Sequence, residues 1–572
     1  MTDGAMTRRG STSGAVLGVN CFSHDTSAAL LVDGQVVAIG EQERFDRDQH
    51  TKHFPHLAIA FCLEQAGVGI DQLDGVAFAH HAGLDFVRGG ADAVARGAPK
   101  RLAAQAYTDA RLVLKERSFR RTWGYRGRVY HVGHHRAHAA SAFFSSPFER
   151  AAVLSLDRGG DFLSTTMSLG VGNRLSELGM VRNPHSLGEI YTAFTWLLGF
   201  RPNADEGKLM GLAPYGRDTL AKDIRDLVRL LPDGRFKVNL PWFRYQREGG
   251  PFSRRGLARF GPPRAPESEI SERHQDLAFA AQDLIEEAGL HVARALHEAT
   301  GMTRVCLAGG VALNSVMNAR LLAETGFEEM FVQPAASDAG NALGAAAWVW
   351  HQELGQPRSW RMEHPFWGPS WTERELAGAL RARGLEFRQV GDPPAEAARR
   401  IADGKVVGWF QGRAEIGPRA LGNRSILADP RRPDMKDIVN ERIKRREGFR
   451  PFAPSVLDER GPEYFERYSH NPFMLLVLPV RPHKRSVIPS VTHVDGTGRM
   501  QSVTAGFNAD YHRLISAFDR LTGVPVVLNT SFNLRGEPMV NRPEEAVEDF
   551  LRSEMDALFL GDLLTEKEPT PE

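Results

Sequence analysis

Residues 16–39 read VLGVNCFSHDTSAALLVDGQVVAI, and this stretch decides the fold class. It holds three apolar runs separated by polar or turn residues, which predicts three consecutive strands. The loop after the first run carries His24 and Asp25, and Asp33-Gly34 after the second run is a two-residue hairpin signal. The predicted strands are Val16–Asn20, Ala28–Val32 and Val36–Ile39.

The same pattern recurs at residues 152–173. An apolar run at Ala152–Leu156 precedes a glycine-rich loop, DRGGD at 157–161, and Thr165–Val171 is apolar again. A repeat of this kind indicates an internal duplication with two lobes, each opening with a hairpin whose tip presents backbone N–H groups to phosphate. We therefore expect an α/β fold with the two-lobed architecture of actin-like ATPases and sugar kinases.

Two strand-to-helix junctions follow further along the chain. Val305–Leu307 predicts a strand that runs into AGGVALN at 308–314, and a helix is expected over 315–322. Glycines at such a junction let a ligand approach the backbone and the N-terminus of the helix. The next strand and loop, at 331–344, carry Asp338, which is either a metal ligand or the N-cap of the following helix.

Residues 134–142, HHRAHAASA, belong to the densest histidine cluster of the chain. His134 and His138 lie four residues apart in an alanine-rich segment that favours helix, so both imidazoles project from one face. Two imidazoles on one helical face form half of a divalent-metal site, which acidic residues from elsewhere would complete. The alternative is a group of hydrogen-bonded structural histidines.

Composition limits the classes of protein. The 572 residues are 42% hydrophobic and 25% charged, which is typical of a soluble globular protein. A net charge of +1 gives no global attraction to nucleic acid or to an anionic membrane. Cys21, Cys62 and Cys306 lie far apart without CxxC spacing, which indicates a reducing compartment. No signal peptide and no apolar run near the ~20 residues of a membrane span are present, so we expect a cytoplasmic protein.

We expect two large domains after a short leader. The insertions at 82–128 and 232–268 are expected at an acceptor site or an oligomer contact, and nucleic-acid contacts are the alternative. The predicted segments are a disordered lead-in at 1–14, a first domain at 15–358 and a second domain at 359–572.

Basic residues are concentrated in the second domain. Between residues 411 and 455 there are 11 Lys and Arg against 6 Asp and Glu, interleaved with glycines and with apolar strands expected at 406–410 and 425–427. Basic side chains on glycine-rich loops suit a small, multiply charged anion, because backbone N–H groups and guanidinium forks can surround it. The alternative is a solvated basic face.

Together these motifs resemble the NodU/CmcH family of carbamoyltransferases, and within it the antibiotic-tailoring branch. The resemblance spans about residues 16–565, and the order and combination of its motifs make it specific. The stretches that carry it are SHDTSAA at 23–29, EQERF at 41–45, HHRAHAASA at 134–142, DEGKLMG at 205–211, AGGVALN at 308–314, Ser337-Asp338, GRAEIGPRALG at 412–422, RPFAP at 450–454 and LNTSFN at 528–533.

The resemblance implies that the first domain is similar to TsaD-type threonylcarbamoyltransferases and the second to YrdC, the threonylcarbamoyl-adenylate synthase. It implies an enzyme whose second domain makes carbamoyl-adenylate from carbamoyl phosphate and ATP, the ATP being accompanied by Mg²⁺. The first domain would then transfer the carbamoyl group to a hydroxyl of a small secondary metabolite, and AMP would leave. It further implies no nucleic-acid or membrane partner, and a homodimer is compatible with it.

The resemblance also assigns site residues. His24, with Asp25 beside it, would help to deprotonate the acceptor hydroxyl. A divalent metal, iron in the best-understood members, would be held by His134, His138, Asp157 and Asp338, and because capping does not explain the other three residues, Asp338 is expected as a ligand. The nucleotide would contact Lys208, Gly309, Gly310 and Asn314. Carbamoyl phosphate would be bound by Arg419, Arg424, Lys444, Arg450, Arg499, Asn529, Ser531 and Asn533.

Two positions depart from the family pattern. Arg158 stands where relatives have glycine in Asp-Gly-x-Gly, so its side chain either changes the phosphate loop or adds a phosphate contact. Asp48-Gln49 replaces a basic pair before His50, so a basic contact is lost unless Lys52 replaces it.

Two other functions are compatible with parts of the sequence. A tRNA threonylcarbamoyltransferase is disfavoured by the near-neutral net charge and by the fusion of both half-reactions in one chain. A non-catalytic, nucleotide-binding regulatory module is disfavoured because the metal-ligand set and the basic loops are both present.

Overall fold

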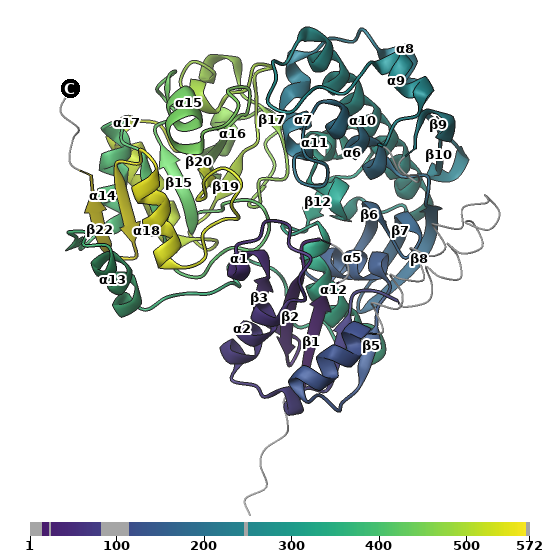
Figure 1. Cartoon of the computed structure of the whole chain (residues 1–572), viewed down its shortest axis with the longest axis horizontal. Helices are drawn as coiled ribbons and strands as arrows, with labels where there is room; N and C mark the ends of the chain where they lie inside the picture. The colour runs from purple at the N-terminus through teal and green to yellow at the C-terminus, as the bar shows by residue number, and fades with distance from the viewer. Residues whose placement is uncertain (1–13, 22–23, 82–113, 245–249, 568–572) are drawn as a thin grey trace, which may run out of the picture.

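Two five-stranded sheets and one eight-stranded sheet organise the computed structural model (Figure 1). The first sheet has the order β3-β2-β1-β4-β5, in which β1 to β3 form an antiparallel meander and β4 and β5 continue it in parallel. These strands confirm the three that were predicted within residues 16–39. Their bounds are β1 Ala15–Asn20, β2 Ser27–Val32, β3 Gln35–Glu41, β4 Gly75–Phe78 and β5 Val129–His131. The structure describes residues 14–21, 24–81, 114–244 and 250–567, so most of the predicted lead-in and part of the first insertion lie outside it.

The second sheet repeats this strand order. Read from its meander edge, it runs β8-β7-β6-β11-β12, with β6 to β8 antiparallel and β11 and β12 continuing in parallel. Two sheets with one strand order confirm the internal duplication and the two-lobed, actin-like arrangement. The bounds are β6 Arg150–Gly160, β7 Leu163–Val171, β8 Arg174–Arg182, β11 Arg304–Ala308 and β12 Glu329–Val332.

The glycine-rich loop expected at 157–161 is shorter than predicted. Strand β6 continues through Gly160, and the turn falls on Asp161 and Phe162, whose φ angles of 49° and 66° are left-handed. The pairing of β6 with β7 is irregular between Leu156 and Gly160, which is a bulge. The Asp157 side chain therefore leaves the regular sheet and contacts His134, the first residue of helix α5 (His134–Phe143).

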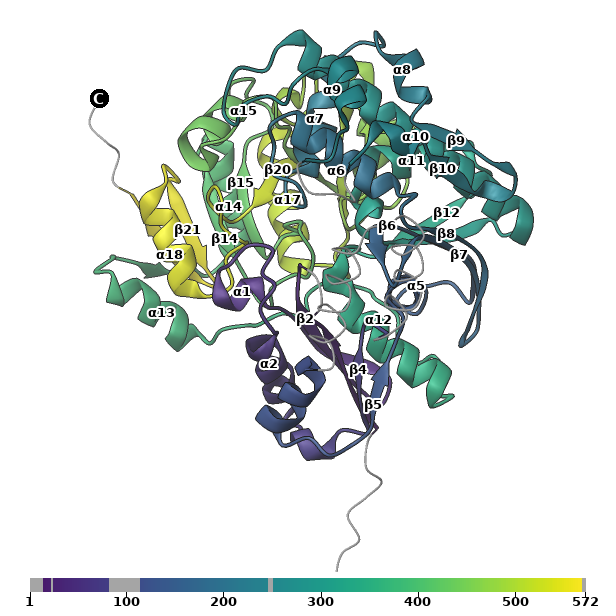
Figure 2. The same ribbon diagram turned by 45° about the vertical axis from the view of Figure 1, so that its right-hand side comes forward.

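Helices α5 (His134–Phe143) and α12 (Asn341–Trp348) lie between the two five-stranded sheets (Figure 2). Helix α5 packs on β6 and β11, α12 packs on β1 and β2, and the two helices pack on each other. Both are rich in alanine, so their backbones approach closely, and a Cβ atom on Gly344 would overlap the carbonyl oxygen of Ala137. This packing places the first turn of α12 beside the first turn of α5.

Replacing Gly344 with alanine is expected to force α5 and α12 apart. The added methyl meets a backbone oxygen that no side-chain rotation can move, and overpacking of this kind costs about 1–3 kcal/mol or more. We expect a lower melting temperature. The matched control is Gly378→Ala in helix α13 (Glu373–Ala382), where nothing lies within 4 Å of the Cβ position and alanine should stabilise by about 0.5–1 kcal/mol. Equal melting temperatures for the two variants would contradict the close packing.

Helix α2 (His56–Ala66) packs on β2 and β3 of the first sheet, whereas α6 (Leu187–Leu197) and α10 (Glu272–Thr300) pack on β6 of the second sheet. The longest, α10 (Glu272–Thr300), begins at a capping box on Ser271 and ends at Gly301 in the left-handed conformation. Among the described residues, no helix combines the length and apolarity that crossing a membrane requires. The other long helices here are α6 (Leu187–Leu197), α7 (Glu206–Leu212) and α11 (Ser315–Glu324).

Residues 388–566 form the eight-stranded mixed sheet, whose order is β13-β22-β21-β14-β15-β20-β16-β19. Helices α14 (Pro393–Ala402) and α17 (Ala509–Thr522) form one pair beside it, and α13 and α18 (Pro543–Arg552) form another. This is the expected α/β layer structure, and β14 and β15 confirm the two predicted strands. The bounds are β13 Arg388–Gln389, β14 Val407–Phe410, β15 Arg424–Ala428, β16 Ala453–Leu457, β19 Gln501–Val503, β20 Val526–Ser531, β21 Ala557–Leu560 and β22 Leu563–Glu566.

We call residues 15–348 the N-terminal region and residues 388–566 the C-terminal region. The two regions share packing, because Phe473 and Phe507 of the C-terminal region join the core of the N-terminal region. Helix α1 (Glu43–Asp46) lies on the side of the N-terminal region that faces the C-terminal region (Figures 1 and 2), and its Arg44 donates to the Gly417 carbonyl in a loop of the C-terminal region. The domain boundary expected at 358 stays a prediction.

Candidate functional site

Four buried side chains converge between the two lobes. His134 and His138 project from one face of α5, and Asp157 comes from the bulge in β6. Asp338 comes from a short 3₁₀ helix, η6 (Asp338–Gly340), just before α12. The two histidine Nε2 atoms lie 3.1 Å apart, and His134 Nε2 lies 3.3 Å from Asp157 Oδ2. Asp338 Oδ1 lies 3.4 Å from both Nε2 atoms, so one ligand atom from each residue falls within 4.8 Å of the others.

This arrangement fits a divalent metal ion. At metal–ligand distances of about 2.1 Å, neighbouring ligand atoms in a tetrahedral or octahedral shell lie about 3.0–3.4 Å apart. Two facing imidazole nitrogens at 3.1 Å repel each other if both are protonated, whereas both can donate lone pairs to a cation. Burial raises the pKa of Asp157, but the hydrogen bond from His134 and the charges of both histidines hold that pKa well below its ordinary value. The cluster therefore presents ionised carboxylates, and a divalent ion would take the place of the histidine protons between the two facing imidazoles.

Asp338 directs its carboxylate at the histidines and does not cap a helix. Ser337 is the N-cap of η6, because its hydroxyl accepts the Ala339 N–H. Burial raises the pKa of Asp338, but the charge of His134 and the hydrogen bond from His138 lower it below the ordinary value. The N-cap alternative is therefore wrong, and the role of Asp338 as a ligand stays a prediction that this geometry favours.

Backbone groups hold the cluster in place. The Gly310 N–H donates to Asp157 Oδ1 at 2.9 Å, as part of the strand-to-helix junction after β11. Asp161 Oδ2 accepts the His134 N–H at 2.6 Å and thereby satisfies a donor at the start of α5. The sequence analysis missed the role of Asp161, although its place at the end of a glycine-rich hairpin turn was visible.

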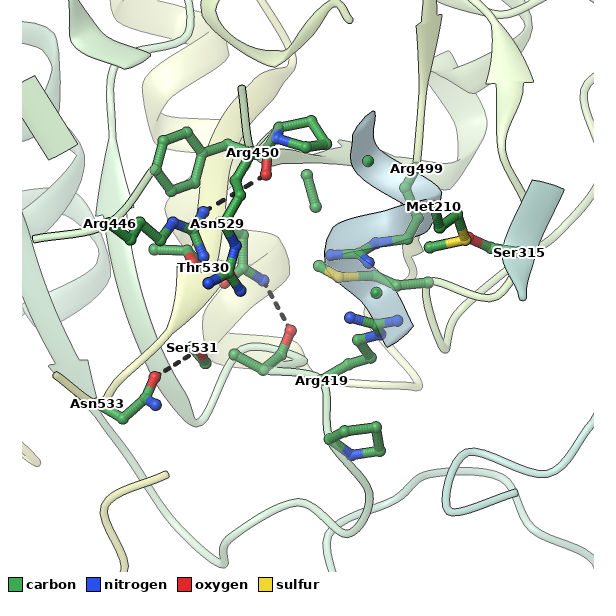
Figure 3. A pocket seen from close by; sticks show the side chains of 18 of the residues that line it. Met210, Ser315, Arg419, Arg446, Arg450, Arg499, Asn529, Thr530, Ser531 and Asn533 are labelled. Carbon is green, nitrogen blue, oxygen red and sulfur yellow. Dashed lines mark hydrogen bonds between the residues drawn. The ribbon is translucent and has the colours of Figure 1, made fainter. Parts of the chain in front are cut away.

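A second site occupies a cavity of about 300 Å³ between the two regions. Figure 3 shows arginine side chains around one space, with Met210 and Ser315 of the N-terminal region on its wall. Amide and hydroxyl groups at the end of β20 lie on the other side, from Asn529, Ser531 and Asn533. Five arginines line this cavity: Arg44, which pairs with Glu41 and Glu43, and a cluster of four from the C-terminal region, Arg419, Arg446, Arg450 and Arg499.

The four clustered guanidinium groups, all positively charged, repel one another electrostatically. Burial and the charge of Arg450 lower the pKa of Arg419 to about 10. Burial, followed by the charges of the other three arginines, lowers the pKa of Arg499 well below its ordinary value. The Nε atoms of Arg419 and Arg499 have no hydrogen-bond partner among the described residues. A cavity with this excess of donors and positive charge fits an anion with several oxygen atoms.

Sequence comparison identifies the family to which this two-site architecture belongs. The profile "Carbamoyltransferase N-terminus" matches residues 15–347, and "Carbamoyltransferase C-terminus" matches residues 398–567. The chain belongs to the carbamoyltransferase family. The metal-type cluster falls in the N-terminal match and the four arginines fall in the C-terminal match.

Curated relatives extend over most of this carbamoyltransferase. An uncharacterized protein of Synechocystis sp. is 40% identical over 97% of both chains. Nodulation protein NolNO of Sinorhizobium fredii is 41% identical over 96% of this chain and 80% of its own length. Nodulation protein U of Bradyrhizobium diazoefficiens is 28% identical over 90% of this chain and 91% of its own. These relatives place the chain in the NodU/CmcH family and identify it as a carbamoyltransferase enzyme.

Solved structures align with this carbamoyltransferase at low scores. The ROK hexokinase from Thermus thermophilus gives a TM-score of 0.28 at 17% identity, covering 58% of this chain and 97% of its own. HypF of T. kodakarensis gives 0.32 at 14% identity, covering 60% of this chain and 48% of its own. The assignment of the fold rests on the strand order described above rather than on these scores.

His24 and Asp25 of the carbamoyltransferase lie together with His50, which the sequence analysis did not assign to a site. Asp25 Oδ2 lies 3.1 Å from His24 Nδ1, and Asp25 Oδ1 lies 2.7 Å from His50 Nδ1. Burial lowers the pKa of His24, but the hydrogen bond and charge of Asp25, with the charge of Asp338, raise it to about 9. His50 lines the arginine cavity, whereas the charge of Asp338 reaches His24. The group around Asp25 therefore reaches the arginine cavity through His50, while its His24 lies within the electrostatic influence of Asp338.

The residues expected to contact the nucleotide are not all at one place. Gly309 has a left-handed φ of 90° and a Cβ there would overlap the Leu156 carbonyl, so this position needs glycine. Asn314 caps α11 by accepting the Met317 N–H at 3.1 Å. Lys208 pairs with carboxylates outside the wall of the arginine cavity. Their contacts with a nucleotide, and that of Gly310, stay predictions.

Arg424 and Lys444 do not line the arginine cavity. Arg424 is fully buried, donates to four backbone carbonyl groups and lies 3.6 Å from the centroid of the Phe410 ring. Lys444 Nζ donates to backbone and side-chain oxygens of Ser531 and Asn533. In this structure both cations hold the loops that carry cavity residues, and direct contact with carbamoyl phosphate stays a prediction. Arg446 was missed because it stands in a run of basic residues at 442–446.

The EQERF motif at 41–45 holds a loop of the C-terminal region. Glu41 Oε1 accepts the Gly417 N–H at 2.5 Å, and Arg44 donates to the Gly417 carbonyl at 2.6 Å. Glu41 and Arg44 are buried and pair with each other at 3.3 Å. Because Gly417 lies two residues before Arg419, the N-terminal region fixes the backbone from which one cavity arginine projects.

The two departures from the family pattern are Arg158, at the metal-type cluster, and Asp48-Gln49, near the arginine cavity. Arg158 is 40% exposed and lies 3.8 Å from Glu189, while the Gly159 N–H still donates to Asp157 at 2.9 Å. Gln49 lines the arginine cavity beside His50, and Lys52 is exposed and does not line it. Lys52 therefore does not replace the missing basic pair at the cavity wall.

Proposed function

We propose that this carbamoyltransferase is ATP-dependent and works in two steps. Carbamoyl phosphate, ATP and one water give carbamoyl-adenylate, phosphate and pyrophosphate: water cleaves carbamoyl phosphate to carbamate and phosphate, and a carbamate oxygen attacks the α-phosphorus of ATP. The hydroxyl of a small secondary metabolite then attacks the carbamoyl carbon, its proton goes to a base, and AMP leaves. Antibiotic tailoring is the setting that the resemblance suggests, and a cytoplasmic location is the one that the cysteine usage suggests.

The four-arginine cavity is the observation that carries the first step. Arg419, Arg446, Arg450 and Arg499 bring more positive charge together than the surrounding protein neutralises, which suits the oxygens of carbamoyl phosphate and of the ATP phosphates. The cavity also has walls from the N-terminal region. Because carbamoyl-adenylate is labile in water, formation next to the transfer site limits its hydrolysis.

The metal-type cluster and the group around Asp25 support the second step. A divalent ion, iron by resemblance, held by His134, His138, Asp157 and Asp338 would supply positive charge beside the adenylate phosphate. In its neutral form His24 would accept the proton of the acceptor hydroxyl. Asp25 would hold the His24 ring in orientation and stabilise the imidazolium that results.

The test of this function needs no acceptor. Purified protein is mixed with carbamoyl phosphate, ATP and Mg²⁺, phosphate and pyrophosphate are measured, and carbamoyl-adenylate is detected by mass spectrometry. We expect all three products in equal amounts from the wild type and none from Arg450→Ala. Binding of ATP without pyrophosphate release would instead indicate a nucleotide-binding module. Adenylate formation only from threonine and bicarbonate would indicate the tRNA-modifying class.

A further inference from the structure

An ion-pair chain crosses between the two regions at the edge of the arginine cavity. Lys208 Nζ, on α7, lies 3.0 Å from Glu447 Oε1 and 3.1 Å from Asp205 Oδ2. The other oxygen of the Glu447 carboxylate lies 3.7 Å from Arg450 Nη1, which is beyond hydrogen-bond distance. The side chains of Lys208 and Glu447 are only 12% and 20% exposed, so water screens this pair weakly.

Glu447 is an unusual neighbour for an anion site. Burial raises the pKa of Glu447, but a backbone hydrogen bond and the contact with Lys208 hold it below the ordinary value, so the carboxylate is ionised at neutral pH. An ionised carboxylate repels a phosphate anion and competes with it for the Arg450 guanidinium. Glu447 therefore lowers the affinity of the cavity for an anion unless another cation holds it.

The surrounding packing favours Lys208 as that cation. The Lys208 ammonium lies 5.5 Å from the centroid of the Phe200 ring, and this ring lies 6.2 Å from that of Phe449. Phe449 belongs to the same loop as Glu447 and Arg450, so the aromatic pair docks this loop against the N-terminal region. The docking keeps the carboxylate within reach of Lys208.

We propose that Lys208 is a positioning residue of the anion cavity: it neutralises Glu447 from the opposite region, so that Arg450 stays available to the substrate phosphate. The proposal rests on the donor step described under the proposed function. It gives the DEGKLMG motif at 205–211 a role in binding carbamoyl phosphate that does not require Lys208 to touch the substrate. The N-terminal region then helps to set the affinity of a pocket whose four clustered arginines, Arg419, Arg446, Arg450 and Arg499, belong to the C-terminal region.

The test combines a variant, its rescue and a matched control. Lys208→Met removes the charge but keeps the aliphatic stem, and we expect the KM for carbamoyl phosphate in adenylate formation to rise about 10- to 100-fold, with kcat changed much less. The double variant Lys208→Met/Glu447→Gln removes the competing carboxylate as well, and its KM should return to within about threefold of the wild type. Lys405→Met, which breaks an exposed pair with Asp556, should leave the KM unchanged.

Three outcomes would overturn the proposal: an unchanged KM in Lys208→Met, a double variant as impaired as the single one, or an effect on the KM for ATP alone. The last two would indicate direct contact between Lys208 and a substrate. Calorimetric titration of all four proteins with inorganic pyrophosphate provides a readout that needs no catalysis. If the wild type makes no adenylate, the proposed function fails, while weaker pyrophosphate binding by Lys208→Met and recovery in the double variant would still support the charge-neutralising role.

Discussion

Replacing His138 with alanine is expected to abolish carbamoyl transfer to an acceptor while carbamoyl-adenylate still forms. His138 is fully buried, and its Nε2 atom faces both His134 Nε2 and Asp338 Oδ1. Its loss removes one of four converging ligands, and metal-ion stabilisation of a transition state amounts to several kcal/mol, so transfer should fall by about 10³-fold or more. The arginine cavity shares no residue with this cluster, so the donor step should continue.

Two measurements separate this effect from general damage. Elemental analysis should find a substoichiometric metal content in His138→Ala, and a chelator followed by re-addition of divalent metal should abolish and then restore transfer by the wild type. The matched control is His131→Ala, since His131 is partly exposed, pairs with Glu116 and lies outside the cluster. Full transfer activity in folded His138→Ala would contradict the assignment of His138 as a metal ligand required for transfer.

The metal-type cluster shows which features of the fold and of the site can be predicted from the sequence. The four-residue spacing of His134 and His138 predicts a shared helical face, and the structure confirms it. The repeated hairpins likewise predict two lobes, because a duplicated strand order leaves the same apolar and turn pattern twice. Those expectations depend on local periodicity alone.

The rest of the site depends on contacts between distant segments. Asp161 caps α5 only because a bulge in β6 moves the hairpin turn past the predicted loop. Arg446 projects into the cavity while Arg442 of the same basic run is exposed, and the sequence gives no sign of which arginine faces inward. The pairing of Lys208 with Glu447 joins residues 239 positions apart, so no spacing rule could have predicted it.

Replacing Arg499 with methionine is expected to weaken substrate binding and to stabilise the fold. Its guanidinium faces three like charges, and its Nε atom has no hydrogen-bond partner among the described residues. Charge-assisted hydrogen bonds to an anion contribute about 1.5–3 kcal/mol each, so the KM for carbamoyl phosphate should rise about 10²-fold. Without an anion the same group only adds repulsion, so the melting temperature in phosphate-free buffer should rise by about 2–4 °C.

Pyrophosphate distinguishes this explanation from ordinary repacking. An anion that binds the folded state stabilises it more the tighter it binds, by about 2.7 kcal/mol when its concentration is 100 times its Kd. Added pyrophosphate should therefore raise the melting temperature of the wild type much more than that of Arg499→Met. Arg513→Met, in which an exposed arginine of α17 loses its pairs with Asp392 and Asp510, should respond to pyrophosphate as the wild type does. A lower melting temperature for Arg499→Met in anion-free buffer would mean that the guanidinium stabilises the folded protein itself and would contradict its role as a group strained until a ligand binds. Three results would together show that substrate relieves the repulsion among the four arginines. The melting temperature of Arg499→Met would exceed that of the wild type in anion-free buffer, this difference would disappear in pyrophosphate, and the KM for carbamoyl phosphate would rise.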